Sequence, residues 1–256
     1  MIQSVSRALD ILTIVSDAKG KPVKLNTIAQ KAGLNGSTCT HLVQTLCEKG
    51  FLSQVSRSAG YVLGAYPYYL TRYRTFQREL VDTCNPALRW IQRRTGHTAL
   101  LAVLVEGEKF VISQAGDSKE ILQERGDLYR GNLYNSATGR AMLCAMRHSE
   151  LVELVHKIGL PSQEDWPGID SLDTLERNLR ILAGKKVICI EQASPDQYDA
   201  IYGISIRTPR GNNCAIGLHV RQPKPPTEQE QSQYQEALLS GAKEISRRLR
   251  FEEELL

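Results

Sequence analysis

Short polar side chains gather in the stretch between residues 37 and 48. At 100° per residue they lie on one side of a helix. They are Ser37, Thr38, Thr40, His41, Gln44 and Thr45. A plain surface helix usually carries Lys and Glu here, whereas short hydrogen-bonding groups suit a helix that presses close to base edges and phosphates. We therefore predict a helix that enters a groove of double-stranded DNA.

The surrounding residues predict the frame that holds this helix. Its opposite side is apolar, with Cys39, Leu42, Val43 and Leu46 at helical spacing. A shorter apolar helix precedes it from residue 25, and Gly33 supplies a residue able to leave that helix with positive φ. The segment 24–50 thus reads as a helix-turn-helix.

Cationic residues near this frame are candidates for phosphate contacts. Residues 51–64 predict two short strands around a turn at 56–60, and Arg57 lies at the tip of that hairpin. A hairpin directly after a recognition helix is a wing, and its Arg is placed for the DNA backbone or a narrow minor groove. Arg7, in a first helix expected over 4–18, and Lys24 are expected to add phosphate contacts.

The first helix is predicted to pack on the pair through its apolar side. Val5, Leu9, Leu12 and Val15 recur at helical spacing, with Ala8 and Ile11 beside them.

Charge divides the chain unequally. Residues 1–78 hold 10 Lys and Arg against 3 Asp and Glu, whereas residues 79–256 hold 22 against 25. A basic module joined to a slightly acidic one indicates that only the first meets a polyanion.

The second part of the chain mixes helices and strands. Helices are expected over 80–95, 137–145, 150–158, 172–183 and 228–249. Strands are expected over 98–105, 109–114, 186–190, 200–206 and 214–220. Turns of hairpin length between them predict an α+β domain with a central, largely antiparallel sheet.

The sequence lacks the usual signatures of several other classes. It has no phosphate-cradling glycine loop, no H-E-x-x-H and no G-x-S-x-G, and its five histidines and six cysteines show no metal-ligand spacing. No apolar run approaches the roughly 20 residues of a membrane span. We expect no catalytic residue, metal or cofactor, no membrane association, and a cytoplasmic protein.

In order and spacing, several short motifs together resemble the IclR family of bacterial transcriptional regulators. They are SRALDIL (6–12), KAGL (31–34), the Ser-Thr pair at 37–38, EKGFL (48–52), YVLG (61–64) and ATGRAML (137–143). The resemblance covers almost the whole chain. It implies a winged helix-turn-helix DNA-binding domain (1–65), a linker helix (66–78) and an effector-binding domain similar to GAF and PAS sensors (79–256). It also implies a homodimer or homotetramer that binds operator DNA.

The resemblance further implies a small-molecule site around the loop and helix start at 135–141. The candidate effector-binding residues are Asn135, Ser136, Gly139, Arg140, Ala141, Glu191, Ile201, His219 and Arg221. A Gly-containing helix N-terminus presents free N–H groups to an anion, and Arg side chains pair with carboxylates, so an organic acid is the expected class. His219 and Arg221 share one face of the last strand, and the sequence leaves open whether that face is the pocket.

The chain departs from the family pattern at several of these positions. His41 stands where many members have Arg, Ile201 replaces a Cys, and Ser205 replaces a Pro. Two other functions stay open. An enzyme that modifies a small molecule would act on a pocket ligand without binding DNA, and a constitutive DNA-architectural protein would bind DNA without responding to any ligand.

Overall fold

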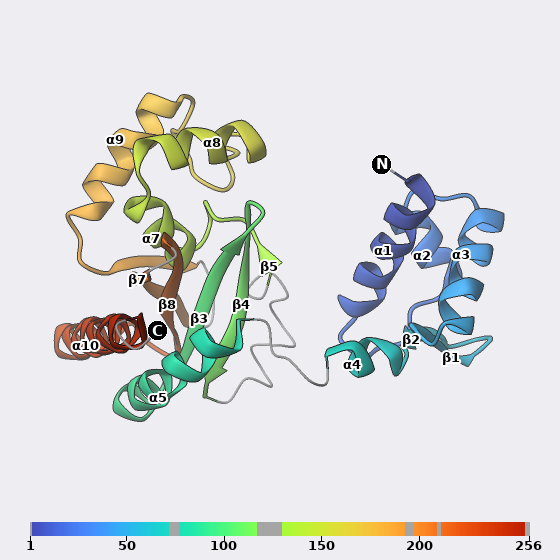
Figure 1. Cartoon of the computed structure of the whole chain (residues 1–256), viewed down its shortest axis with the longest axis horizontal. Helices are drawn as coiled ribbons and strands as arrows, with labels where there is room; N and C mark the ends of the chain where they lie inside the picture. Colours follow the sequence, from blue (N-terminus) through green and yellow to red (C-terminus); the bar gives the residue numbers. More distant parts are fainter. Residues whose placement is uncertain (1, 72–76, 117–129, 193–196, 209–210, 254–256) are drawn as a thin grey trace. The chain divides into compact units, whose positions relative to one another are not determined.

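The computed structural model describes residues 2–71, 77–116, 130–192, 197–208 and 211–253. The chain divides into two compact units, Met1–Phe76 and Gln77–Leu256. Each unit has its own hydrophobic core, and each is described separately (Figure 1). Along the described residues, no helix combines the length and the apolar character needed to cross a membrane.

The N-terminal unit is a three-helix bundle followed by a hairpin. Its elements are α1 (Gln3–Ser16), α2 (Leu25–Lys31), α3 (Gly36–Glu48), β1 (Leu52–Ser56), β2 (Gly60–Leu63) and α4 (Tyr66–Thr71). The core joins Ile11 and Val15 of α1 to Ile28 of α2 and to Cys39 and Val43 of α3, all at most 2% exposed. The predicted apolar side of the recognition helix is therefore the side that packs inward.

The expected packing of α1 is wrong at its N-terminal end. Val15 is buried as predicted, but Val5 and Leu9 are 54% and 58% exposed. The buried side of α1 is centred on Ala8, Ile11 and Val15, and Val5 and Leu9 lie on its edge, away from α2 and α3. Helical spacing shows that an apolar stripe exists but does not show which edge of it meets the bundle.

A six-stranded sheet organises the C-terminal unit. Its order is β5-β4-β3-β8-β7-β6, and each neighbouring pair is antiparallel. The strands are β3 (Thr98–Val105), β4 (Glu108–Ala115), β5 (Arg130–Gly131), β6 (Ile188–Gln192), β7 (Tyr198–Thr208) and β8 (Gly211–Gln222). The predicted α+β class with a central antiparallel sheet is confirmed.

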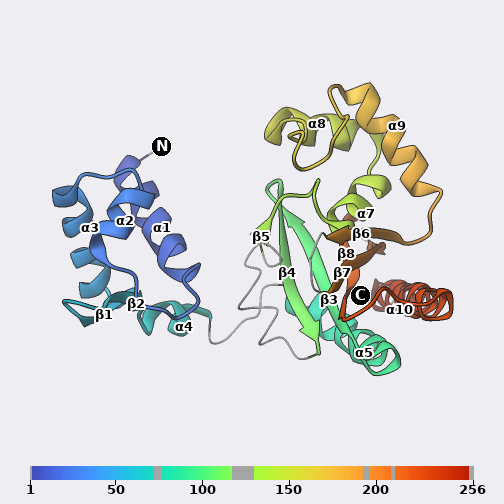
Figure 2. The ribbon, with the colours of Figure 1, turned by 180° about the vertical axis from the view of Figure 1, so that it is seen from behind.

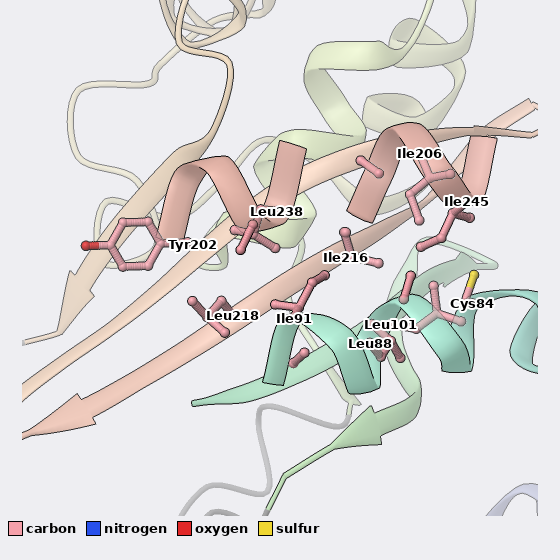
Figure 3. Close-up of a cluster of buried hydrophobic side chains, with 14 of the residues drawn as sticks. Cys84, Leu88, Ile91, Leu101, Tyr202, Ile206, Ile216, Leu218, Leu238 and Ile245 are labelled. Carbon is pink, nitrogen blue, oxygen red and sulfur yellow. The ribbon is translucent and has the colours of Figure 1, made fainter. Parts of the chain in front are cut away.

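Helices cover both faces of this sheet. The two long ones, α5 (Arg78–Thr95) and α10 (Glu228–Glu253), lie on one face, and α7 (Ala137–Ala145), α8 (His148–Ile158) and α9 (Leu172–Ala183) lie on the other (Figures 1 and 2). Figure 3 shows the first of the two resulting cores, where Leu88 and Ile91 of α5 and Leu238 of α10 meet Ile216 and Leu218 of β8. We call the two sides the α10 face and the α7 face.

Successive residues of β8 alternate between these two cores. Ile216, Leu218 and Val220 belong to the α10 face, so His219 and Arg221 point to the α7 face.

The predicted linker helix at 66–78 is described only in part. Helix α4 covers Tyr66–Thr71, residues 72–76 lie outside the described residues, and α5 begins at Arg78. The start of α4 belongs to the N-terminal unit, because the Tyr66 N–H donates to the Gly50 carbonyl at 3.0 Å and the Tyr66 ring packs edge-on against Phe51 at 4.9 Å.

Candidate functional site

Helix α3 presents its polar side to solvent. Ser37, Thr40, His41, Gln44 and Thr45 are exposed, and Thr38 is half-buried. The helix begins after Asn35, whose side-chain oxygen accepts the Thr38 N–H at 2.8 Å and so satisfies one of the free donors of the first turn. The buried residues of the opposite side fix the rotation of α3, and with it the direction of the polar row.

Several groups of this row pair within their own helix. The Thr40 hydroxyl donates to the Gly36 carbonyl at 2.8 Å, and the Thr45 hydroxyl donates to the His41 carbonyl at 2.9 Å. Each hydroxyl oxygen keeps lone pairs that can accept, so both threonines are better acceptors than donors in this arrangement.

Gln44 is also engaged with a neighbour. Its amide nitrogen donates to Glu48 Oε1 at 3.1 Å. Bidentate recognition of adenine uses both the amide oxygen and the amide nitrogen of Gln. The amide nitrogen has two hydrogens, so the bond to Glu48 occupies one donor and leaves the other donor and the amide oxygen for a base.

The cationic candidates lie around the hairpin and the starts of helices. Arg57 is exposed in the turn between β1 and β2, and the Ser56 hydroxyl shapes this turn by accepting the Ala59 N–H at 3.0 Å. Val23 and Tyr61 exchange two backbone hydrogen bonds at 2.8 and 2.9 Å, which holds the exposed Lys24 beside strand β2. Arg7 is half-buried on α1.

In the C-terminal unit, the first turn of α7 lies directly on the sheet. A Cβ added at Gly203 of β7 would stand 2.6 Å from the carbonyl carbon of Ala137, and one added at Gly139 would stand 2.1 Å from the Leu133 carbonyl oxygen. The Gly139 N–H donates to the Ser136 hydroxyl at 3.1 Å. One of the N–H groups expected to face an anion is therefore used by the cap residue of the helix.

Arg140 joins α7 to two loops of its own unit. Its Nε donates to the Tyr134 carbonyl at 2.6 Å, one terminal nitrogen donates to the Asp165 carbonyl at 3.1 Å, and the guanidinium lies 3.9 Å from the Trp166 ring centre. Burial lowers the pKa of Arg140 to about 10, and the group stays charged at neutral pH. These contacts give Arg140 a structural role, whatever it also binds.

Beyond α7, a buried polar group occupies the same face of the sheet. Asp199 of β7 lies opposite Arg221 of β8, and Ile201 lies opposite His219. His219 Nε2 is 2.8 Å from Asp199 Oδ1, and Arg221 Nε is 3.8 Å from Asp199 Oδ2. His219 and Asp199 are only 2% and 5% exposed. His219 and Arg221 therefore both lie on the α7 face of the sheet.

The other nitrogen of His219, Nδ1, is buried. Among the described residues, no group forms a hydrogen bond with it. A catalytic triad would need a hydroxyl or thiol there. The Asp199–His219 pair therefore resembles two members of a triad without the nucleophile.

Known proteins resemble this chain in both units. The IclR helix-turn-helix domain profile matches residues 4–56. The transcriptional repressor IclR of Escherichia coli strain K12 is 27% identical over 161 residues, which make up 62% of this chain and 58% of that protein. The chain therefore aligns with less than two thirds of that repressor.

Two solved structures extend the likeness to nearly the full length. An IclR transcriptional regulator from Alicyclobacillus acidocaldarius has a TM-score of 0.73 at 20% identity, covering 96% of this chain and 98% of that one. An IclR homolog from Microbacterium hydrocarbonoxydans, complexed with 4-hydroxybenzoate, has a TM-score of 0.71 at 19% identity, covering 97% and 99%. At these identities the likeness concerns the fold.

Residues 4–56 of the chain thus match the IclR helix-turn-helix domain, and both units share the fold of solved IclR regulators.

Within the C-terminal unit, the structure brings together only some of the predicted effector residues. Ser136, Gly139 and Arg140 belong to α7 and its cap, and Asn135 is exposed just before them. Ala141 and Ile201 are buried in the core between α7 and the sheet.

Glu191 does not join this group. Its carboxylate accepts the Tyr198 hydroxyl at 3.1 Å, and its neighbours across the strands, Ala200 and Tyr202, belong to the α10 face. The sheet therefore separates Glu191 from His219, and the two side chains do not lie on one face.

Sequence reasoning missed Asp199, the residue that holds His219 and Arg221. Asp199 lies two residues before Ile201, and strand alternation places both on one face. Its pairing with Arg221 depends on the register between β7 and β8, and a single sequence does not reveal that register.

Proposed function

We propose that this protein is a sequence-specific, DNA-binding transcriptional regulator whose operator binding is modulated by a small acidic metabolite. The observation that carries the proposal is the exposed polar row of α3, held by a buried apolar side within the region that matches the IclR helix-turn-helix profile. Such a regulator acts on chromosomal DNA, so we place it in the cytoplasm.

The contacts with DNA fall into two classes in this proposal. Gln44 and His41, in the middle of the row, read base edges in the major groove, and Ser37, Thr38, Thr40 and Thr45 position the helix. Arg57 contacts the backbone or the minor groove from the hairpin, and Arg7 and Lys24 contact phosphates. Electrostatic attraction to the basic N-terminal unit supplies much of the affinity, so binding weakens steeply with salt.

We further propose that two copies associate through exposed apolar side chains of the N-terminal unit. Ile2, Val5 and Leu9 of α1 and Tyr68 and Leu70 of α4 are between 54% and 80% exposed. A second copy would remove this apolar surface from water and would match a two-fold symmetric operator. Assembly into a dimer or a tetramer is consistent with this interface.

Analytical ultracentrifugation tests the interface with the variant Leu9→Asp. Because Leu9 is exposed, we expect the variant to keep its helical circular dichroism and to dissociate into monomers. An unchanged sedimentation coefficient at micromolar concentration would rule out this surface as the interface.

The effector site in this proposal lies on the α7 face. It comprises Asn135, Ser136, Gly139, Arg140, Ala141, Ile201, His219 and Arg221, and Asp199 is added. The solved IclR homolog complexed with 4-hydroxybenzoate supports an organic acid as the class of ligand. Such a ligand changes operator affinity only to the extent that it binds one arrangement of the protein better than another.

DNA selection with the full-length protein tests the function. Random duplexes are selected on the protein, and the enriched sequence is then titrated at 50, 100 and 200 mM salt. We expect a two-fold symmetric site, a steep fall of affinity with salt, and weaker binding by the variant Gln44→Ala. Failure to enrich any sequence would overturn the proposal.

Neither alternative function gains a supporting observation. The Asp199–His219 pair is the best candidate for an enzyme centre, but His219 Nδ1 has no nucleophile bonded to it. A constitutive DNA-architectural protein would have no use for a buried polar group on the sheet. Thermal-shift measurements with organic acids test the constitutive protein, which would bind none of them, since a ligand of the folded state raises Tm. An enzyme would instead convert the bound acid and bind no selected DNA.

A further inference from the structure

The environment of His219 indicates which hydrogen-bonding group the effector carries. His219 is 2% exposed, its Nε2 faces Asp199, and its Nδ1 is buried with no hydrogen-bond partner in the part of the chain that the structure describes. Buried polar atoms in folded proteins nearly always have a hydrogen-bond partner. When such an atom lies at a binding site and has no partner, the ligand can supply that partner.

The Asp199 carboxylate decides which hydrogen-bonding role Nδ1 has. An ionised carboxylate can only accept, so the nitrogen that faces it at 2.8 Å must carry the hydrogen. In the neutral imidazole the second nitrogen is then a bare acceptor. His219 Nδ1 therefore needs a hydrogen-bond donor.

The charges of this group point in the same direction. Asp199 stands between His219 and Arg221, and its carboxylate lies within ion-pair distance of both. A carboxylate of the chain itself therefore already faces His219 and Arg221. A neutral donor meets His219 Nδ1 without requiring another charge to be buried.

We propose that the effector carries a hydroxyl group that donates its hydrogen bond to His219 Nδ1. The ligand class is then a hydroxy acid, and the site discriminates it from the oxo acid of the same skeleton. The oxygen of an oxo group can only accept, so it leaves Nδ1 unpaired. This inference rests on the proposed function, because it concerns the same effector site.

Matched pairs of acids test the discrimination on the full-length protein. Lactate against pyruvate, 2-hydroxybutyrate against 2-oxobutyrate, and mandelate against phenylglyoxylate each exchange one hydroxyl for one oxo group. Calorimetric titration gives the dissociation constants at pH 7.5. We expect the hydroxy acid of at least one pair to bind at least about tenfold more tightly than its partner, because an unpaired buried acceptor is costly.

Nitrogen chemical shifts of the histidine rings give a second, independent reading. In the ligand-free protein we expect the ring hydrogen of His219 on Nε2, the nitrogen that faces Asp199, and none on Nδ1. The bound hydroxy acid should shift the Nδ1 resonance in the direction of an accepted hydrogen bond. The variant His219→Asn assigns the resonance.

The variant Asp199→Asn inverts the hydrogen bonding at this position. The Asn side-chain amide can donate to Nε2, and that moves the ring hydrogen to Nδ1 and makes Nδ1 a donor. The preference for the hydroxy acid should then fall or reverse. The control Asp82→Asn, an exposed carboxylate of α5, should leave the preference unchanged.

Each outcome decides a different question. A preference for the oxo acid, equal binding within every pair, or hydrogen on Nδ1 of the free protein would overturn the inference while leaving the regulator itself intact. Absence of binding by every acid would overturn the inference together with the effector site. The proposed function as a whole fails only if the same samples also bind no selected DNA.

Discussion

The polar groups of α3 and those of β7 and β8 differ in their exposure and in the location of their hydrogen-bond partners. On α3 the side chains are exposed, and Thr40, Gln44 and Thr45 bond to groups of their own helix. On the sheet, Asp199 and His219 are almost fully buried and bond across two strands. The first set can exchange its partners for water at little cost, whereas the second cannot. Substitutions on α3 should therefore change DNA binding and spare stability, whereas substitutions in the buried group should lower stability.

The largest effect is expected at Asp199. The variant Asp199→Ala leaves His219 and Arg221 without their carboxylate, and breaking a buried ion pair costs about 3 kcal/mol or more. Urea denaturation followed by tryptophan fluorescence measures this loss in the correct unit, because Trp90 and Trp166, the only tryptophans, both belong to the C-terminal unit.

The matched control is Asp82→Ala. Asp82 pairs with Arg78 at 3.4 Å on the exposed side of α5, and such surface pairs contribute about 0.5 kcal/mol. Equal losses in the two variants would mean that the burial of Asp199 does not determine its contribution.

Arg140 tests an intermediate degree of burial. Replacing it by Ala removes two hydrogen bonds to backbone carbonyls and the contact with Trp166, so we expect a loss of about 2 kcal/mol. The control Arg180→Ala removes an exposed partner of Glu176 and should cost less than about 0.5 kcal/mol. If Arg140→Ala keeps full stability and loses only the response to acids, the contacts of Arg140 with the loops are incidental.

The sequence predicted helices best where local signals agreed. The range 137–145 was expected and is the observed α7, because Ser136 provides a cap and the residues after it favour a helix. The range 172–183 was likewise expected and is the observed α9, capped by Ser171.

The errors involve information that a local pattern does not contain. Leu9 was expected to pack inward, but the direction of an apolar stripe depends on the neighbouring helices. The sequence did not show that Glu191 and His219 lie on opposite faces of the sheet, since a shift of one residue along a strand exchanges the two faces. Asp199 went unnoticed because its partners are about 20 residues away in sequence and meet it only through strand register.

The exposed row of α3 should behave in the opposite way to Asp199. We expect Gln44→Ala to weaken binding to the selected operator by about 1–3 kcal/mol and to relax preference at one base pair, with no change in the unfolding of the protein. Arg57→Ala should weaken binding to all sequences alike and reduce the slope of log K against log salt by about 1. Titrations of the operator and of a scrambled duplex at several salt concentrations separate the two effects. If Gln44→Ala weakened binding to the operator and to the scrambled duplex equally, Gln44 would position the helix on the DNA and would not read a base.

The smallest effect on stability is expected at an exposed charge of the C-terminal unit. Comparing it with the buried Asp199 of the same unit shows how much of the effect is due to burial. Glu244 of α10 pairs with Arg247 at 3.0 Å and Arg248 at 2.7 Å, and the hydrogen bonds from these two guanidinium groups lower the pKa of Glu244 to about 2. Because the folded-state pKa is below the unfolded value, the stabilisation is present above about pH 4.5 and is lost as the pH falls towards 2. Solvent screens these charges, so Glu244→Gln should lower Tm only slightly at pH 6, and the difference from the wild type should shrink between pH 4.5 and pH 3. A loss at pH 6 as large as that of Asp199→Ala would mean that the unit is sensitive to any charge change, and the contrast between exposed and buried groups would then have no explanatory value.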